Sequence, residues 1–268
     1  MTNLEKQLLA APRNHRYYLT AAVLVFLLFL WSFSSLHLSE INSSGLKIAS
    51  NIVKGIVNPD LELLFNMSKQ SVPYLLLQTL AIAFLGTVVG AVLSIPFAFL
   101  AASNIVPKPI AWVTRLLLIM IRTIPALVYG LMFIRVSGPG PFAGVLTISL
   151  TSIGMLSKLY VDAIEELDKK VLESMTSIGC STFEKIRFGI IPQLMAIFLS
   201  VTIYRFDMNM REASILGLVA AGGIGAPLIF AMNSYKWNQV GSILIGLVVL
   251  ILLIEWISTK LRSKLVNG

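Results

Sequence analysis

Ionisable side chains inside apolar stretches are the residues of this sequence best suited to chemistry. A charged side chain near the middle of a membrane span costs about 2.5–3.5 kcal/mol on insertion scales, so it needs an ion-pair partner or a water-filled cavity. Arginines in such a place can attract an anion, and carboxylates can neutralise them. The candidates for a translocation pathway or a buried ion network are Arg122, Arg205, Asp207, Asn209, Arg211 and Glu212.

The spacing of these residues restricts how they can pair. Asp207 and Arg211 are four residues apart, so they can form an ion pair on one helix face. Glu212 cannot face Arg211 within the same helix, which leaves Arg122 or Arg205, in this chain or in a second copy, as its partner. Three arginines against two carboxylates leave one surplus positive charge per chain. A structural ion network and an anion pathway are both open interpretations, and they are compatible.

The composition of the chain is that of a membrane protein. Of its 268 residues, 56% are hydrophobic and 13% are charged, whereas soluble domains carry roughly 25% charged residues. The net charge of +8 does not indicate nucleic-acid binding, because the lysines and arginines stand mostly at the ends of apolar runs. The single cysteine, Cys180, excludes an intrachain disulfide.

Six apolar runs are long enough to form membrane spans, each of which needs about 20 residues. Pro96 and Pro125 predict kinks within two of them, and Gly86 and Gly90 form a face of small residues for close helix packing. The predicted spans are Tyr17–Leu36, Pro73–Ser103, Ala111–Val136, Phe142–Ala163, a fifth that starts near Pro192, and Val240–Ser258.

The segments between the spans indicate the topology. Basic residues concentrate in the N-terminal segment, the 104–115 loop, the 158–190 region and the C-terminal segment, which puts these parts and both termini in the cytoplasm. Ile48, Ile52 and Ile56 recur every four residues and predict an amphipathic helix on the outer membrane surface; a loosely packed loop is the alternative.

A glycine-rich stretch interrupts the chain after the fifth span. Gly222, Gly223 and Gly225 lie in Gly-Gly-Ile-Gly-Ala-Pro, which breaks any helix. We expect a broken, partly re-entrant segment there. Non-helical backbone at membrane depth is tolerated only where protein covers it or where it lines a cavity.

The polar loop at residues 164–191 predicts two short helices joined by a sharp turn. Gly179 ends the first, because glycine tolerates the left-handed conformation at a helix end. Ser181 or Thr182 caps the second, with Glu184 following closely. Pro192 suits the first turn of the next span. Such a knob can project into a groove of a partner protein; an ordinary solvated loop is the alternative.

This loop resembles the one by which the permeases of type I ABC importers contact their ATPase. Their pattern is Glu-Ala-Ala, three residues, Gly, nine residues, and Ile-x-Leu-Pro. Glu173, Gly179 and Pro192 match it in identity and register. The departures are Ser174 and Met175 for the two alanines, Gly189 for the isoleucine and Ile191 for the leucine.

Four further stretches resemble the permease of phosphonate importers. They are residues 122–134, 137–146, 154–168 and 204–225, and the resemblance extends over roughly residues 70–262. It implies an all-α permease that carries phosphonates, or a related oxyanion such as phosphite or phosphate, across a bacterial cell membrane. In this family the glycine-rich stretch lies on the outer side of the pathway, so Gly222, Gly223 and Gly225 become candidates for an external gate.

The resemblance also implies the partners. They are a second copy of the chain, two cytoplasmic ATPase subunits that use ATP and Mg²⁺, and an extracytoplasmic binding protein. The sequence has no GxxxxGK[ST] motif, so we expect the chain itself to be neither an ATPase nor the holder of a metal or cofactor. The predicted domains are residues 1–72 with the first span, a core at 73–262, and a tail at 263–268.

Three other functions remain as alternatives. The first is an ABC permease for another small solute, such as an amino acid. The second is a secondary transporter or channel without an ATPase, which the loop at 164–191 disfavours. The third is an intramembrane enzyme, which the absence of HExxH and GxSxG motifs from the sequence disfavours.

Overall fold

The computed structural model describes residues 15–34, 43–66, 68 and 70–267, and every regular element among them is a helix. Five of these helices are long and apolar enough to cross a membrane, and one bent pair makes a sixth if it counts as a single span. The prediction of an all-α membrane protein is confirmed, and its count of six spans holds with the bent pair taken as one span. The chain divides between Ser50 and Asn51 into two units, which are described separately.

The first unit contains α2 (His15–Ser34), which corresponds to the first predicted span. Its large apolar side chains are exposed from Tyr17 to Phe33, as a helix surrounded by lipid requires. The next helix, α3 (Ser43–Val57), crosses the division between the units. It contains Ile48, Ile52 and Ile56, so the helix predicted from their spacing is confirmed.

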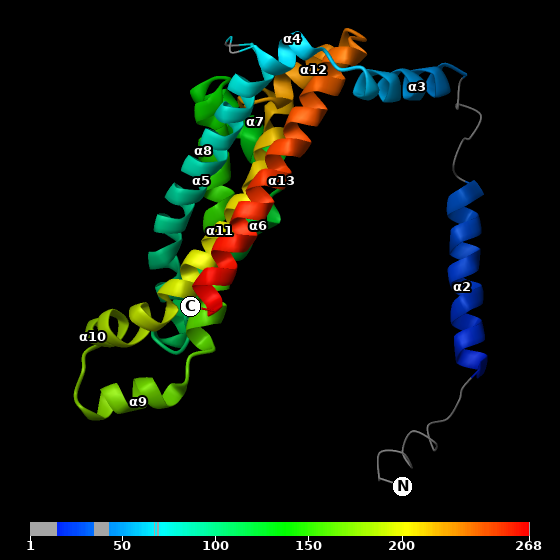
Figure 1. The fold of residues 1–268 in the computed structure, drawn as a ribbon. Helices are drawn as coiled ribbons and strands as arrows, with labels where there is room; N and C mark the ends of the chain where they lie inside the picture. The colour runs from blue at the N-terminus through cyan, green and yellow to red at the C-terminus, as the bar shows by residue number, and fades with distance from the viewer. Residues whose placement is uncertain (1–14, 35–42, 67, 69, 268) are drawn as a thin grey trace. The chain divides into compact units, whose positions relative to one another are not determined.

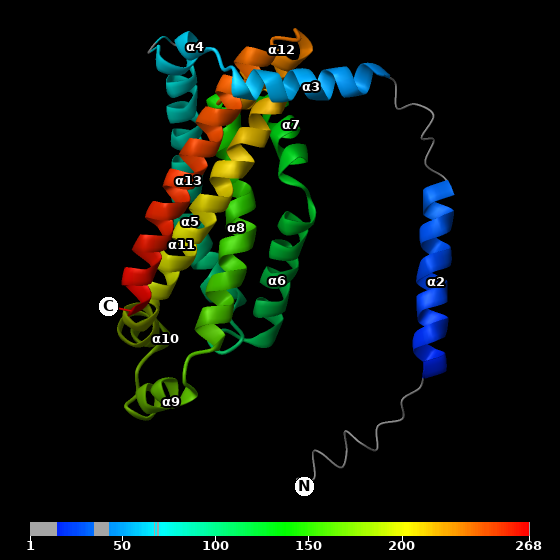
Figure 2. The ribbon, with the colours of Figure 1, turned by 45° about the vertical axis from the view of Figure 1, so that its right-hand side comes forward.

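Four long helices pack side by side in the second unit (Figures 1 and 2). They are α5 (Val72–Ala101), α8 (Pro141–Glu165), α11 (Ile191–Leu216) and α13 (Trp237–Asn267). The core lies between them as three clusters along the bundle. Representative buried side chains are Leu156, Tyr160 and Phe198 at one end, Ile148, Met210 and Leu216 in the middle, and Val72, Ile224 and Ile243 at the other end.

Small residues bring α5 and α8 into close contact. A Cβ atom added at Gly86 would lie 2.6 Å from Cγ2 of Ile148, and one added at Gly90 would lie 2.5 Å from Cβ of Ser152. Neither position has room for a larger residue. The predicted packing role of these two glycines is therefore confirmed. The close contact also fixes the position of the polar side chains of α8 relative to α5.

The third predicted span, Ala111–Val136, is not one kinked helix. It consists of α6 (Lys108–Thr123) and α7 (Ala126–Ser137), which meet at an angle of 86°. The prediction of a simple kink at Pro125 was wrong, because both Ile124 and Pro125 leave the helical conformation, with ψ angles of 125° and 144°. Proline lacks the N–H group that would continue the helix, and it drives the preceding residue toward extended backbone.

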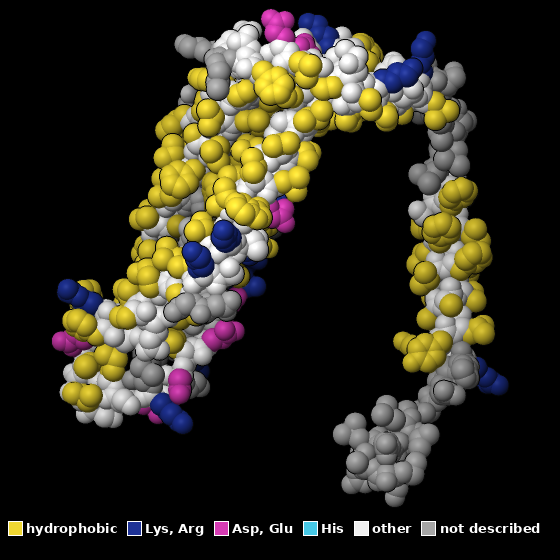
Figure 3. All heavy atoms as spheres, viewed as in Figure 1, with side chains coloured by type: hydrophobic (Ala, Val, Ile, Leu, Met, Phe, Trp, Pro, Cys, Tyr) yellow, Lys and Arg dark blue, Asp and Glu magenta, His cyan; other side chains and the backbone are white. Residues whose placement is uncertain are grey.

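The two ends of the bundle carry different short elements. At one end, α9 (Lys169–Ser177) and α10 (Thr182–Glu184) project from the long helices, near the end of α13 (Figures 1 and 2). At the other end lie α4 (Leu61–Phe65) and α12 (Gly225–Asn233). Figure 3 shows apolar side chains over most of the flank between these ends, which suits a surface in contact with lipid.

Candidate functional site

The coupling segment, residues 164–191, contains a tight turn at Gly179. The N–H group of Gly179 donates to the carbonyl of Thr176 and that of Cys180 to the carbonyl of Met175, each at 3.0 Å. These two bonds form a Schellman motif, in which the residue after the helix cap adopts a left-handed conformation. Gly179 has a φ of +87°, so the prediction that it ends the first short helix is confirmed.

The second half of the coupling segment begins with a capping box. The backbone N–H and the hydroxyl of Ser181 both donate to the Glu184 carboxylate at 2.7 Å, and the Glu184 N–H donates to the Ser181 oxygen at 3.4 Å. Ser181 rather than Thr182 is thus the cap. The opposed bonds fix the direction in which the chain leaves the turn.

A π-helical turn, Lys185–Ile190, joins α10 to α11. It was not predicted. Pro192 lies in the first turn of α11, where its ring would clash with the carbonyl four residues earlier in a regular α-helix. The wider π turn moves that carbonyl away. The prediction that Pro192 lies in the first turn of the next span is therefore confirmed. The π turn that precedes it was not predicted, because the sequence has no simple signal for that helix type.

The coupling segment exposes an unusual amount of apolar surface. Ile178, Phe183 and Phe188 are 81%, 68% and 66% exposed; Ile178 directly precedes Gly179, and the two phenylalanines follow it in the segment. The carboxylate of Glu173 makes no hydrogen bond or ion pair within the described residues, and the residue is exposed. Exposed apolar side chains next to a rigid turn and an unpaired carboxylate are typical of a protein-binding surface.

Inside the bundle, Arg205 and Glu212 form a bidentate ion pair. Nη1 and Nη2 of Arg205 each lie 3.0 Å from one carboxylate oxygen of Glu212. The arginine is 3% exposed, and its remaining N–H groups reach Thr151, Ser152 and the sulfur of Met155 on α8. Of the two partners that the sequence allowed for Glu212, the structure selects Arg205.

Asp207 and Arg211 pair as their spacing predicted, with Nη2 and Oδ2 3.0 Å apart. Arg211 also lies 3.6 Å from the carboxylate of Glu255 on α13. The count of charges from the sequence omitted Glu255, which balances the surplus positive charge assigned to the cluster. Glu255 stands within the predicted span Val240–Ser258, so the search for ionisable residues in apolar stretches could have found it.

Asn209 holds three helices together. Its Nδ2 donates to the hydroxyl oxygens of Thr87 on α5 at 2.7 Å and of Ser152 on α8 at 2.9 Å. The residue is fully buried. Of the two interpretations given for the cluster, a structural network and an anion pathway, these bonds of Asn209 between helices fit the structural network. Thr87 and Ser152 were missed, because hydroxyl residues in an apolar helix carry no distinctive sequence signal.

Arg122 differs from the other two arginines of the cluster, because it makes no ion pair or hydrogen bond with any described residue. Its side chain lines a cavity of about 270 Å³ at the break between α6 and α7. We call this the break cavity. Besides Arg122 it is lined by Ile121, Ile124, Pro125 and Ala126 at the break, Thr151 and Met155 of α8, and Arg205 and Glu212 of α11.

The glycine-rich stretch forms a closed turn against α5. Gly222 and Gly223 have φ angles of +84° and +76°. The N–H of Gly223 donates to the side-chain oxygen of Gln78 at 3.0 Å, and that of Ile224 to the hydroxyl of Thr79 at 3.0 Å. Gly225 begins α12. The helix break predicted here is confirmed, and two of its N–H groups are satisfied by side chains of α5.

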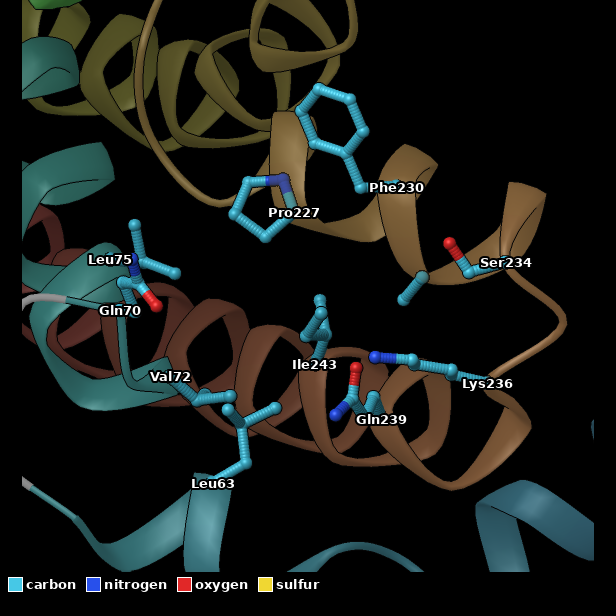
Figure 4. A pocket seen from close by; sticks show the side chains of 11 residues that line it. Leu63, Gln70, Val72, Leu75, Pro227, Phe230, Ser234, Lys236, Gln239 and Ile243 are labelled. Atoms are coloured by element: carbon cyan, nitrogen blue, oxygen red, sulfur yellow. The ribbon is translucent and has the colours of Figure 1, made fainter.

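A separate pocket of about 470 Å³ lies at the end of the bundle that carries α4 and α12 (Figure 4). Val72 and Leu75 of α5, Pro227 and Phe230 of α12 and Ile243 of α13 give it a mainly apolar wall. Its one charged lining residue is Lys236. This pocket shares no lining residue with the break cavity, so the two are distinct.

Comparison with known proteins identifies relatives over most of the chain. The model of the family "Binding-protein-dependent transport system inner membrane component" matches residues 94–265. The "Phosphate-import permease protein PhnE" of Mycolicibacterium smegmatis is 36% identical over 190 residues, which cover 70% of this chain and 36% of that protein. The "Phosphite transport system permease protein PtxC" of Stutzerimonas stutzeri is 34% identical over 189 residues, which cover 70% of this chain and 69% of that protein.

The chain thus spans about a third of the length of the first relative and just over two thirds of the second. Among solved structures, the inward-facing MetNI methionine ABC transporter has a chain with a TM-score of 0.61 and 20% identity, over 71% of this chain and 94% of that one. An amino acid ABC transporter with histidines gives a TM-score of 0.58 at 19% identity, over 82% and 97%.

These likenesses confirm the predicted fold of a type I importer permease. Taken with the length of the family match, they assign the chain: it belongs to the family of binding-protein-dependent transport system inner membrane components.

Proposed function

We propose that this chain is the permease subunit of an ATP-driven importer of phosphorus oxyanions, with phosphonate, phosphite and phosphate as the candidate solutes. Two relatives at 36% and 34% identity are named for phosphate import and phosphite transport. A third, from Escherichia coli, is named as a putative cryptic phosphonate transport permease and is 31% identical over 122 residues. The unpaired Arg122, exposed at the break cavity, supports an anionic cargo.

The observation that carries the ATP-driven mechanism is the geometry of the coupling segment. Its turn is fixed by the Schellman bonds at Gly179 and the capping box at Ser181, and the same segment exposes Ile178, Phe183 and Phe188. Such a surface suits insertion into a groove of an ATPase subunit. The ATPase would hold ATP and Mg²⁺, since the chain contains no phosphate-binding loop motif of its own.

The assembly that follows contains two copies of this chain, two ATPase subunits and an extracytoplasmic binding protein. The coupling segment lies at the same end of the bundle as the last turns of α13, where Lys260, Arg262 and Lys264 stand (Figure 1). Basic residues at that end support a cytoplasmic position for it and for the C-terminus. Closure of the ATPase pair would then draw the two coupling segments together and open the pathway outward.

A reconstituted complex tests this function. The chain would be co-expressed with the ATPase encoded beside its gene, placed in lipid nanodiscs and supplied with the neighbouring binding protein. We expect 2-aminoethylphosphonate, phosphite or inorganic phosphate to stimulate ATP hydrolysis, whereas methionine does not. Stimulation by methionine alone would contradict the cargo class, and failure to copurify with any ATPase would contradict the mechanism.

A further inference from the structure

Arg122 lies where two cavities meet. One is the break cavity. The other, of about 180 Å³, lies between α6 and α8, and we call it the lower cavity. Arg122 is the only described residue that lines both, so the two spaces adjoin at its side chain. The charged lining residues of the lower cavity are Arg115, Arg122, Lys158 and Asp162.

The two cavities follow one another toward the cytoplasmic end proposed above. Thr151 lines the break cavity and Lys158 lines the lower one, two turns further along α8, which is about 10 Å at 1.5 Å per residue. The lower end of α8 is marked by Glu165, which pairs with Arg115 at 2.6 Å. A solute that passed Arg122 would therefore meet Lys158 in the lower cavity, which the paired Arg115 also lines.

The basic side chains that line the two cavities are not equally free to bind an anion. Arg205 is occupied by Glu212, and Arg115 by Glu165 and by the carbonyl of Ala101. In contrast, neither Arg122 nor Lys158 forms an ion pair or hydrogen bond within the part of the chain that the structure describes. Asp162 is also unpaired there and lies four residues beyond Lys158 on α8. The lower cavity thus has a free cation at each side and a carboxylate near its exit.

A glycine holds the stem of Arg122 in this position. A Cβ atom added at Gly154 of α8 would lie 2.7 Å from Cγ of Arg122 and 3.6 Å from its Cδ. The absence of a side chain at Gly154 therefore gives the arginine stem a groove on α8 to rest in. With its stem against α8, Arg122 lines both cavities.

We propose that Arg122 and Lys158 form an anion lane, in which a phosphorus oxyanion is held first by Arg122 in the break cavity and then by Lys158 in the lower cavity. This inference rests on the proposed function. A guanidinium matches a phosphonate or phosphate in charge and in planar hydrogen-bond geometry. With one free cation at each step the anion is bound weakly enough to move on, and Asp162, four residues from Lys158 on α8, weakens the attraction of that lysine for the anion.

The test uses the complete complex in sealed vesicles, with import of phosphite, inorganic phosphate and 2-aminoethylphosphonate measured separately. For the anion that the wild-type complex imports, we expect Arg122→Gln and Lys158→Gln each to reduce the import rate by about tenfold at low solute concentration. Arg122→Lys keeps the charge and retains most of the rate. Arg135→Gln is the matched control, because Arg135 is exposed, as Arg122 and Lys158 are, but lines neither cavity, and it stays within about twofold of wild type.

Three outcomes would overturn the lane. If the wild-type complex imports one of the anions and Arg122→Gln imports it equally well, the lane is wrong while the proposed function stands. If the glutamine variants lose retained phosphatidylglycerol in native mass spectrometry but import normally, the two cations bind lipid headgroups instead. If the wild-type complex imports none of the three anions, the cargo class and the lane both fall.

Discussion

Met175 and Gly189 share one space in the coupling segment. A Cβ atom added at Gly189 would lie 2.5 Å from the Met175 sulfur, and Gly189 is buried beneath it. In the loop that this segment resembles, an alanine and an isoleucine stand at these two positions. The two departures therefore compensate for each other, with the larger side chain moved from one side of the contact to the other.

This contact predicts non-additive effects. Gly189→Ile alone should destabilise the coupling segment by about 1–3 kcal/mol, because it forces two side chains into one space. The double variant Met175→Ala/Gly189→Ile should recover most of that loss. Thermal unfolding of the purified complex, and its ATP-dependent import, measure the effect. Simple addition of the two single-variant effects would contradict the shared space.

Gly179→Arg should uncouple ATP hydrolysis from import without preventing membrane insertion. The side chain itself would meet open space, but the φ of +87° penalises any residue with a Cβ by about 1–2 kcal/mol. Gly179→Asn is the matched variant, because asparagine tolerates the left-handed conformation better, and it should keep most of the coupling. Import and ATP hydrolysis are measured on the same vesicles; normal import by the arginine variant would refute the role of the turn.

Phe183→Ser should reduce the amount of ATPase that copurifies with the chain. Phe183 is 68% exposed, so its replacement removes apolar contact area without opening a cavity in the fold. Phe65→Ser, at a site 74% exposed at the opposite end of the bundle, is the control and should leave the ATPase bound. Equal losses from both variants would indicate a general effect of surface polarity rather than a docking surface.

Glu212→Gln should destabilise the complex by about 1–3 kcal/mol, because the buried Arg205 then loses a charged acceptor. Glu255→Gln offers a comparison with another carboxylate of the same helix pair. It lies 3.6 Å from Arg211 and both side chains are about half exposed, so its loss should cost less than about 1 kcal/mol. The midpoints of thermal unfolding in detergent provide the measurement. Equal shifts would mean that burial of Arg205 does not matter.

Gly154→Ala should raise the KM of import by about threefold to tenfold, since it displaces the stem of Arg122. Gly130→Ala is the control: a Cβ there would lie 2.9 Å from a terminal methyl group of Leu216, which can move aside. The combination of Gly154→Ala with Arg122→Gln should be no worse than Arg122→Gln alone. A further loss in the double variant would show that Gly154 acts through something other than Arg122.

Local features were predictable from the sequence, because short-range chemistry determines them. The turn at Gly179 follows from one residue type at a helix end, and the helix at Ser43–Val57 follows from a four-residue period. The choice of Arg205 over Arg122 for Glu212 was not predictable, because both arginines line one cavity with Glu212 and only the three-dimensional structure shows which of them is in contact. The missed hydroxyl groups of Thr87 and Ser152 likewise become partners only when three helices meet.

The paired charges of α11 affect how this helix inserts into the membrane. Arg205 pairs with Glu212 and Asp207 with Arg211, so all four ionised side chains of this helix find a partner within the helix itself. A nascent segment with unpaired charges would have to wait for a neighbour before it left the translocon. Because α11 carries its own counter-ions, we expect it to enter the bilayer as an electrically neutral unit, before α13 has been synthesised.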